Sequence, residues 1–273
     1  MSGATAAAGA AASRGRAADA APAASRDSAD ADADSLADAL AARLGVRERT
    51  ASPVPRAPSP AQPRHLLILD VNGLLLDRRR EPAPGNVPPD LKYPMGRFYS
   101  YVYDRPHAAA SCAWALARFR VAVWSSAQAH ILAPLVQHVF GSSAGALAFV
   151  WSQAECSVDG TVATRGARVG TKPRFLKELQ RVFAARLGTP TTTLLVDDDP
   201  YKATRNPPHT ALHPAPYEVG DRERDNALGE QWAIRMLLQR LADAPSVPDF
   251  IAINALPAGA VADVAPQGAA AAR

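Results

Sequence analysis

The segment HLLILDVNGLLLD, residues 65–77, decides the fold. Its four consecutive apolar residues, Leu66–Leu69, predict a strand that is buried on both faces of a sheet. Asp70 follows this strand directly, and the turn-forming pair Asn72-Gly73 comes next. In open α/β sheets the carboxyl ends of the strands border the crevice where ligands bind. Taken alone, Asp70 is equally consistent with a simple turn, so its role depends on the residues at the ends of the other strands.

The central part of the chain alternates strand candidates with helix candidates. Further strands are expected at FRVAVW (119–124), LAFVW (147–151), TLLVD (193–197) and residues 210–212. Helices are expected at residues 105–118, 128–140, 173–186 and 227–242. This order predicts an α/β fold with a mainly parallel, Rossmann-like sheet of about five strands flanked by helices. A small irregular insert with a short hairpin at FYSYVY is expected over residues 78–103, and a mobile loop over residues 156–170.

The two ends of the chain differ in composition from its centre. Residues 1–63 carry seven arginines and seven acids, so the net charge of +4 belongs to residues 64–273. The N-terminal residues are rich in Ala, Asp and Pro and cannot offset the entropy of ordering, so we expect disorder, with a marginal helix at residues 35–44. We expect one domain over residues 64–254 and a disordered tail over residues 255–273.

Composition also excludes several classes of protein. The two cysteines, Cys112 and Cys156, cannot form a disulfide framework, which favours a reducing compartment, nuclear or cytoplasmic. No apolar run reaches the 18 or so residues that a membrane span requires. The positive charge is too weak to indicate direct nucleic-acid binding, and we expect a monomer. Arg14 and Arg16 in an acid-free start leave a mitochondrial location as an alternative.

Polar side chains with useful chemistry gather near the expected strands. Ser125 follows the second strand, Asp197 and Asp198 end the fourth, and Lys177 lies on the helix before that strand. Carboxylates from two strand ends are the oxygen ligands that Mg²⁺ prefers, while a lysine and a hydroxyl suit a phosphate group. Together with Asp70, these residues predict a site for Mg²⁺ and phosphate at the carboxyl edge of the sheet.

Five segments occur in an order that is typical of one superfamily: LLILDVNGLLLD, YDRP, VAVWSSA, FLKELQRV and TLLVDDDPYKA. The set resembles the haloacid dehalogenase (HAD) superfamily. Within it, the chain is most similar to the phosphatases of the RNA polymerase II C-terminal domain and to the NLI-interacting-factor-like proteins. The resemblance extends from residue 64 to about residue 254. It implies a HAD-like fold and a Mg²⁺-dependent phosphatase that acts on phosphoserine or phosphothreonine in a protein segment.

Position by position, the resemblance implies a role for each candidate residue. Asp70 is expected to be the aspartyl nucleophile, Ser125 the phosphate-binding hydroxyl, and Lys177 the lysine that steadies nucleophile and phosphate. The groups expected to hold Mg²⁺ are Asp70, the backbone carbonyl of Asn72, Asp197 and Asp198. Lys172 is a less favoured alternative to Lys177, because it precedes the expected helix and its neighbours do not match the family pattern.

One position departs from the family pattern. The family has a second aspartate two residues after the nucleophile, which acts as general acid and base, and this chain has Asn72 there. An amide cannot exchange a proton near neutral pH, and losing such a group costs about 10² to 10⁴ in rate. The expected enzyme is therefore a slow phosphatase. The alternative is a catalytically inactive domain that binds a phosphorylated or unphosphorylated protein segment, similar to the mitochondrial inner-membrane import translocase subunit of this family.

Overall fold

The computed structural model describes residues 65–163, 171–231 and 233–254. The predicted disorder of residues 1–63, the helix at 35–44 and the tail at 255–273 all lie outside the described residues. Across the described part of the chain, no helix is both long enough and apolar enough to cross a membrane.

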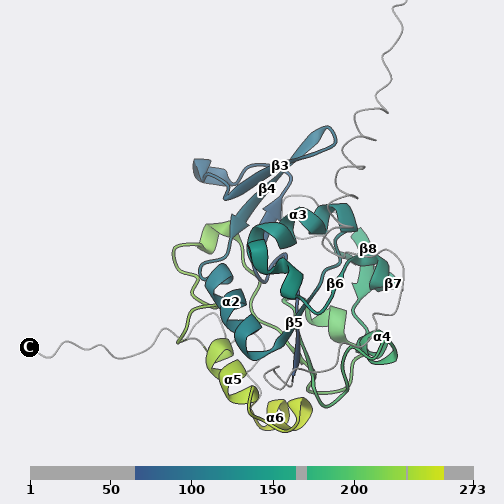
Figure 1. Ribbon diagram of the computed structural model, residues 1–273. Coiled ribbons are helices and arrows are strands. Elements are labelled where there is room, and N and C mark those ends of the chain that lie inside the picture. The colour runs from purple at the N-terminus through teal and green to yellow at the C-terminus, as the bar shows by residue number, and fades with distance from the viewer. Residues whose placement is uncertain (1–64, 164–170, 232, 255–273) are drawn as a thin grey trace, which may run out of the picture.

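A five-stranded parallel sheet forms the centre of the fold (Figure 1). In spatial order its strands are β10 (Ala211–Leu212), β9 (Thr193–Val196), β1 (Leu66–Leu69), β5 (Arg120–Trp124) and β6 (Val150–Trp151). The apolar run of β1 is central, because it pairs with β5 on one side and with β9 on the other. All four of its residues are buried, which confirms the predicted mainly parallel α/β sheet.

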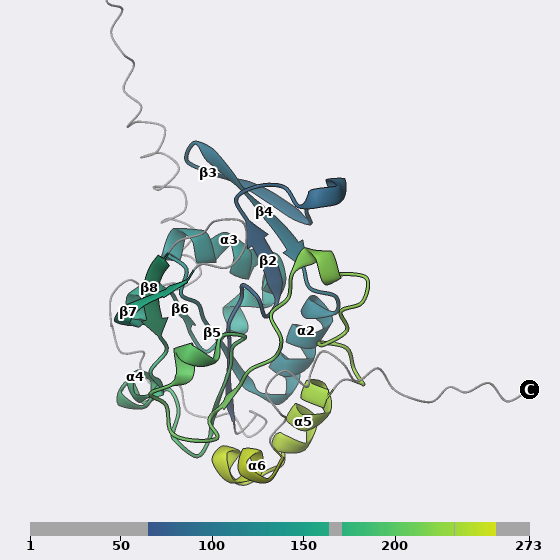
Figure 2. The ribbon, with the colours of Figure 1, turned by 180° about the vertical axis from the view of Figure 1, so that it is seen from behind.

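Two separate cores cover the two faces of this sheet (Figures 1 and 2). The helices of the first core are α2 (Ala108–Arg118), α3 (Ala129–Phe140), α5 (Ala233–Leu241) and α6 (Val247–Asn254). Leu67 and Leu69 of β1 belong to this core. Leu66 and Ile68 belong to the second core, with residues of α4 (Leu179–Ala184). Side chains alternate along a strand, so one continuous apolar run contributes to both cores.

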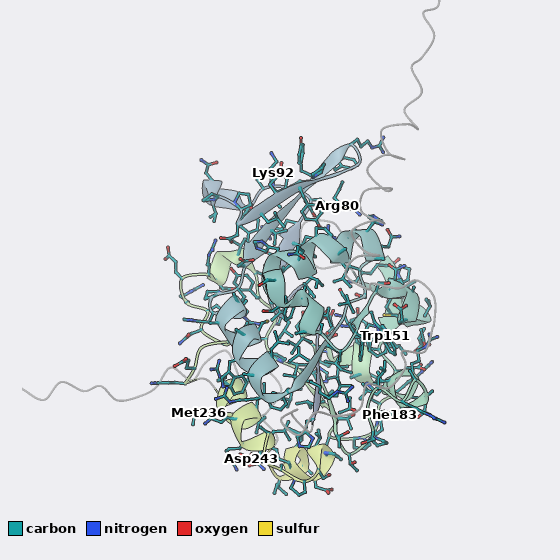
Figure 3. All side chains as sticks on the ribbon, viewed as in Figure 1. Arg80, Lys92, Trp151, Phe183, Met236 and Asp243 are labelled. Atoms are coloured by element: carbon teal, nitrogen blue, oxygen red, sulfur yellow. The ribbon has the colours of Figure 1, made fainter. Side chains whose placement is uncertain are left out.

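The segment after β1 forms an antiparallel sheet, so the expectation of an irregular insert is wrong. Its strands are, in spatial order, β2 (Leu76–Arg79), β4 (Phe98–Asp104) and β3 (Leu91–Met95). FYSYVY lies within the single strand β4 and does not form a hairpin by itself. Prolines suggested irregularity, but Pro94 lies in the edge strand β3, where proline is tolerated. The sheet projects at the top in Figures 1 and 2, and Figure 3 labels Lys92 on β3.

A second antiparallel pair, β7 (Ser157–Ala163) and β8 (Thr171–Leu176), replaces the expected loop and the first part of the expected helix. The prediction of a loop is therefore wrong for residues 157–163, which form β7. The rest of the predicted loop, residues 164–170, lies outside the described residues. Gly160 has φ +70° and lies where the register between β7 and β8 shifts. This glycine therefore marks a β-bulge in β7. The helix that follows, α4, is only six residues long.

Other boundaries differ by a few residues. Of the expected strand at 147–151, only Val150–Trp151 form β6, although Ala148 and Phe149 also form backbone hydrogen bonds with β5. The expected helix at 227–242 begins at Ala233, and α6 was not predicted. Helix α2 begins at Ala108, because His107 before it adopts the left-handed conformation at φ 67°. None of these differences moves a strand end that carries a candidate site residue.

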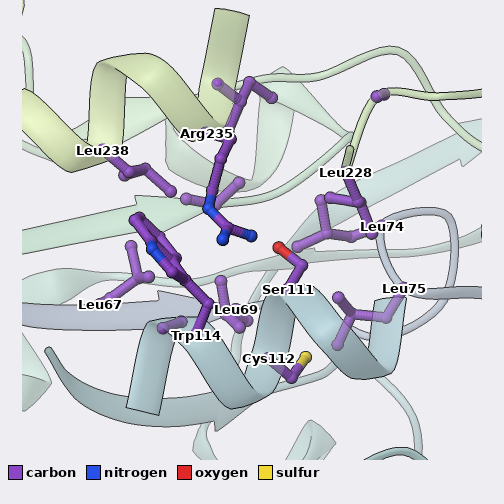
Figure 4. A pocket seen from close by; sticks show the side chains of 14 residues that line it. Leu67, Leu69, Leu74, Leu75, Ser111, Cys112, Trp114, Leu228, Arg235 and Leu238 are labelled. Atoms are coloured by element: carbon purple, nitrogen blue, oxygen red, sulfur yellow. The ribbon is translucent and has the colours of Figure 1, made fainter. Parts of the chain in front are cut away.

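The first core leaves a small apolar cavity between β1, α2 and α5 (Figure 4). Its volume is about 30 Å³, which leaves room for no more than a few water molecules. Arg235 of α5 places its guanidinium 3.9 Å from the ring centroid of Trp114 on α2. Apolar side chains such as Leu67, Leu74 and Leu238 form most of the wall. The cavity is a gap in the packing of the core and not a ligand site.

Candidate active site

Three buried carboxylates meet at the carboxyl edge of the parallel sheet. Asp70 follows β1, while Asp197 and Asp198 follow the neighbouring strand β9. Each offers one oxygen, and these oxygens lie within 4.8 Å of one another. The pairing continues past the strands, because the N–H of Asp70 donates to the carbonyl of Val196 at 3.0 Å. Strand pairing therefore brings together the three acids that the sequence singled out.

Two buried lysines neutralise part of this negative charge. The Lys177 ammonium lies 3.1 Å from Asp70 Oδ1 and 2.5 Å from Asp197 Oδ2. The Lys202 ammonium lies 2.5 Å from Asp70 Oδ2 and 2.9 Å from Asp197 Oδ1. Both oxygens of both carboxylates thus contact an ammonium group. In addition, Asp70 Oδ1 accepts a hydrogen bond from the N–H of Val71 at 2.7 Å, so the orientation of this carboxylate is fixed.

Lys177 lies in the turn between β8 and α4, and not on a helix as expected. Its N–H donates to the carbonyl of Lys202 at 2.8 Å. The side chain of Asn206 donates to the carbonyl of Lys177 at 2.9 Å and accepts from the N–H of Leu179 at 2.8 Å. The amide of Asn206 therefore holds the turn in place. The less favoured Lys172 is exposed on β8.

Lys202 is a residue of the cluster that the sequence did not single out. It lies in a short 3₁₀ turn, Pro200–Ala203, which directs its side chain back over the acids. Its ammonium also lies 3.9 Å from Asp198 Oδ1 and 3.4 Å from Asp199 Oδ2. The sequence feature that could have identified Lys202 is its spacing from Asp198 and Asp199. A lysine three or four residues after an acid in a helical turn is positioned to pair with that acid.

The charges of the cluster move its pKa values in opposite directions. Burial alone would raise the pKa of Asp197, but Lys177 and Lys202 outweigh burial and lower this pKa to about 2. Burial raises the pKa of Asp198 to about 7, assisted by its acidic neighbours and opposed by Lys202. Burial would lower the pKa of Lys202, but the surrounding carboxylates raise it well above its usual value. Of these acids, Asp198 has the most to gain from a further cation.

Ser125 and Asn72 lie at the same edge of the sheet. Ser125 is buried and comes directly after β5, the neighbour of β1. Asn72 is exposed, and its Oδ1 accepts a hydrogen bond from the N–H of Arg78 at 2.7 Å. The amide oxygen of Asn72 therefore supports the turn that leads into β2.

Gly73 allows the loop after β1 to pass close to Asp198. Its φ is +89°, a conformation that favours glycine, and a Cβ at this position would overlap the Asp198 carboxylate. A larger residue would displace this carboxylate from the cluster.

Arg105, from the YDRP segment, holds the same loop from the other side. The side chain is buried, and its guanidinium donates to Leu74 O and Ala215 O, each at 3.2 Å. It also donates to Asp225, with the shortest contact at 2.8 Å. The loop that carries Asn72 is therefore tied to a segment more than a hundred residues later in the chain.

A groove of about 440 Å³ begins beside the cluster. Asn72, Gly73 and Asp198 form one part of its lining. The remaining lining residues are Asp77–Pro82, Pro84, Pro216, Tyr217 and Glu218. Arg80, one of three consecutive arginines in this lining, is labelled in Figure 3. The groove therefore connects the Asp198 side of the cluster with the arginine run that leads into β2 and with residues 216–218.

Comparison with known proteins gives the family. The model of the NLI interacting factor-like phosphatases matches residues 65–248, which is more than half of the chain. The chain belongs to the NLI interacting factor-like phosphatase family. This confirms the resemblance carried by the five sequence segments. No curated protein matches the chain.

Two solved structures are similar to this NLI interacting factor-like phosphatase domain. One is a variant of the fission yeast RNA polymerase II CTD phosphatase Fcp1 bound to beryllium fluoride. It has 18% identity and a TM-score of 0.42, over 65% of this chain and 51% of that one. The other is Fcp1, described as an essential RNA polymerase II CTD phosphatase, with 17% identity and a TM-score of 0.42, over 68% and 56%. The chain spans only about half the length of these structures.

The acidic cluster of this family member fits a small divalent cation. Its donors are hard carboxylate oxygens from Asp70, Asp197 and Asp198, which are the ligand type that Mg²⁺ prefers. Gly73, the residue directly after Asn72, closely approaches the Asp198 carboxylate, and all three residues line the same groove. These residues would together hold the ion at the carboxyl edge of the sheet.

Proposed function

We propose that the domain is a slow Mg²⁺-dependent phosphatase for phosphoserine or phosphothreonine in a protein segment, acting through Asp70. The observation that carries this proposal is the convergence of Asp70, Lys177, Asp197 and Asp198 in one buried cluster. Asp70, the carbonyl of Asn72, Asp197 and Asp198 would hold Mg²⁺. A bound Mg²⁺ supplies charge neutralisation for the phosphate oxygens.

Asp70 is well placed to act as nucleophile. One of its carboxylate oxygens attacks phosphorus, the P–O bond to the serine or threonine oxygen breaks, and the phosphoryl group becomes attached to Asp70. Lys177 steadies the other oxygen at 3.1 Å, and the Ser125 hydroxyl would donate to the phosphoryl group. Water then hydrolyses phospho-Asp70, which releases inorganic phosphate and restores the carboxylate.

Asn72 limits both halves of this reaction. The leaving alkoxide needs a proton, and the attacking water must lose one, but an amide does neither near neutral pH. Asn72 Oδ1 accepts a hydrogen bond from Arg78 that an aspartate could accept equally well. Replacement by aspartate is therefore compatible with the local fold, and it restores the missing acid and base.

A binding function is the second candidate, and the groove together with Asn72 favours it. The lining of the groove contains three arginines together with the acids Asp77, Glu81, Asp198 and Glu218. Arg79 is paired with Asp77 at 3.2 Å, whereas Arg80 is exposed and provides a donor for an acidic or phosphorylated segment. Such a segment could bind without being hydrolysed, because binding does not need the general acid.

The test is a phosphatase assay of the full chain with Mg²⁺, using an aryl phosphate and a phosphoserine peptide. An aryl group leaves easily, so the wild type is expected to release it weakly or in a single burst, with near-background activity on the peptide. Asn72→Asp is expected to gain about 10² to 10⁴ in rate, the range of general acid–base catalysis. Asp70→Asn is expected to abolish all activity.

Two results would change the conclusion. Rapid hydrolysis of the peptide by the wild type would show that another residue supplies the proton, and the enzyme would not be slow. No gain in Asn72→Asp, although Mg²⁺ binds, would favour the binding function.

A further inference from the structure

Lys202 places a permanent positive charge among the acids that would hold a metal ion. Its ammonium lies 2.5 Å from Asp70 Oδ2, 2.9 Å from Asp197 Oδ1 and 3.9 Å from Asp198 Oδ1. These are the same three carboxylates whose oxygens lie within 4.8 Å of one another. The Lys202 side chain therefore lies within 4 Å of all three carboxylates of the candidate ligand set.

The two lysines of the cluster differ in their relation to this ligand set. Lys177 contacts Asp70 Oδ1 and Asp197 Oδ2, the oxygens that Lys202 does not contact. Lys202 also approaches Asp198 and Asp199, so it lies on the side of the cluster where four carboxylates meet. Lys202 therefore has contacts with all three acids that would hold a metal ion, in addition to Asp199.

We propose that Lys202 competes with Mg²⁺ for Asp70, Asp197 and Asp198, an inference that rests on the proposed metal site. Mg²⁺ binds oxygen at about 2.1 Å, and a second cation at hydrogen-bond distance from the same oxygens would repel it. Metal binding must therefore displace the ammonium of Lys202 from Asp70 Oδ2. The cost of this displacement weakens the affinity for Mg²⁺.

The backbone around Lys202 would remain in place during such a displacement. Its carbonyl accepts the N–H of Lys177 at 2.8 Å, and its N–H donates to the carbonyl of Asp199 at 3.0 Å. The four-carbon stem of a lysine has enough freedom to move the ammonium alone. The exchange is therefore local: one side chain leaves the acids when the ion enters.

The charge balance of the cluster predicts how the loss of Lys202 would change the affinity for Mg²⁺. With all groups ionised, four acids face two lysines, which leaves a net charge of minus two. Without Lys202 the same acids face Lys177 alone, so the site attracts a divalent cation more strongly. The metal-free protein would also lose stability, because the carboxylates then repel one another with less compensation.

The experiment measures Mg²⁺ affinity and does not depend on turnover. The full chain is freed of metal with EDTA and titrated with MgCl₂, by calorimetry and by the shift in melting temperature. Lys202→Met is expected to bind Mg²⁺ at least about tenfold more tightly than the wild type, because a like charge at this range is removed. The Lys202→Arg variant retains the positive charge and is expected to bind Mg²⁺ as weakly as the wild type does. The control Lys172→Met alters an exposed lysine and should match the wild type.

Each outcome decides the matter. If a folded Lys202→Met protein binds Mg²⁺ no more tightly than the wild type, the proposed competition is wrong. Binding of Mg²⁺ by the wild type would still support the metal site of the proposed function. Failure of Mg²⁺ to bind either protein overturns both. Should Lys202→Met not fold without metal, Lys202→Gln retains a donor for Asp70 without the charge, and the same tenfold gain is required of it.

Discussion

Two buried ionic clusters in this domain are built in opposite ways. Around Arg105, one guanidinium faces one carboxylate, Asp225, and several backbone carbonyls, so charge and hydrogen bonds are balanced. Around Asp70, four carboxylates face two lysines, and negative charge remains in excess. The first arrangement holds two distant segments together. The second has a built-in electrostatic cost, which is typical of sites that receive a ligand.

The largest expected effect on stability is in the balanced cluster. Arg105→Met removes the guanidinium and leaves Asp225 as a largely buried carboxylate without its partner. Breaking such a pair costs about 3–5 kcal/mol in the free energy of unfolding. Urea unfolding measures this value, with Arg224→Met as the control, because that side chain is 82% exposed and should change stability by less than about 0.5 kcal/mol. A loss below about 1 kcal/mol for Arg105→Met would show that the cluster does not hold the loop.

The next largest effect on stability is expected in the acidic cluster, where the substitution Asp198→Asn should stabilise the protein. The pKa of Asp198 rises from 3.8 to about 7 in the folded protein. Between these values the folded state holds the proton more tightly than the unfolded state, so stability falls as the pH rises and the loss is complete above pH 7. In EDTA at pH 8, Asp198→Asn is therefore expected to be more stable than the wild type by roughly 1–4 kcal/mol.

Two further measurements sharpen this contrast. At pH 4 the advantage of Asp198→Asn should vanish, because Asp198 is then protonated in the folded wild type. Added Mg²⁺ should stabilise the wild type and have little effect on the variant, since one metal ligand is lost. A variant less stable than the wild type at pH 8 would mean that ionised Asp198 contributes to the stability of the metal-free fold.

The sequence predicted the parts of the site that depend on strand order. Apolar runs ending in Asp70, Ser125 and Asp197 reveal the carboxyl edge of a parallel sheet, and pairing of adjacent strands brings these ends together. The positions of the two lysines are set differently. Lys177 lies in a turn fixed by the side chain of Asn206, and Lys202 in a 3₁₀ turn, and neither turn has a periodic pattern in the sequence.

The sequence was least informative for the antiparallel segments. Prolines at residues 82–94 and glycines at 160–170 are typical of loops, yet strands β3 and β7 form there because their partners β4 and β8 are adjacent in the chain. The role of Arg105 was also invisible, because its partner Asp225 is separated from it by 120 residues. Pairings at such a distance arise from the tertiary fold and not from local pattern.

A third ionic pair, between His138 and Asp104, shows what solvent does to the same kind of contact. His138 Nε2 lies 2.9 Å from Asp104 Oδ1, but the side chains are 21% and 37% exposed. The hydrogen bond with Asp104 raises the pKa of His138 above 6.5, against the effect of burial. Removing one partner of a fully buried pair costs about 3–5 kcal/mol, whereas solvent screening reduces the contribution of an exposed pair to about 1 kcal/mol or less.

The smallest expected effect concerns this pair. Because the pKa of His138 is raised on folding, its contribution to stability is complete below pH 6.5 and is lost as the pH rises through the higher pKa of the folded state. His138→Gln should therefore be less stable than the wild type by about 1 kcal/mol or less at about pH 5.5, and the difference should shrink by about pH 9. Urea unfolding of both proteins at the two pH values measures it. A difference that grows with pH would mean that neutral His138 contributes through packing, and that its charge pair with Asp104 adds nothing to the stability of this fold.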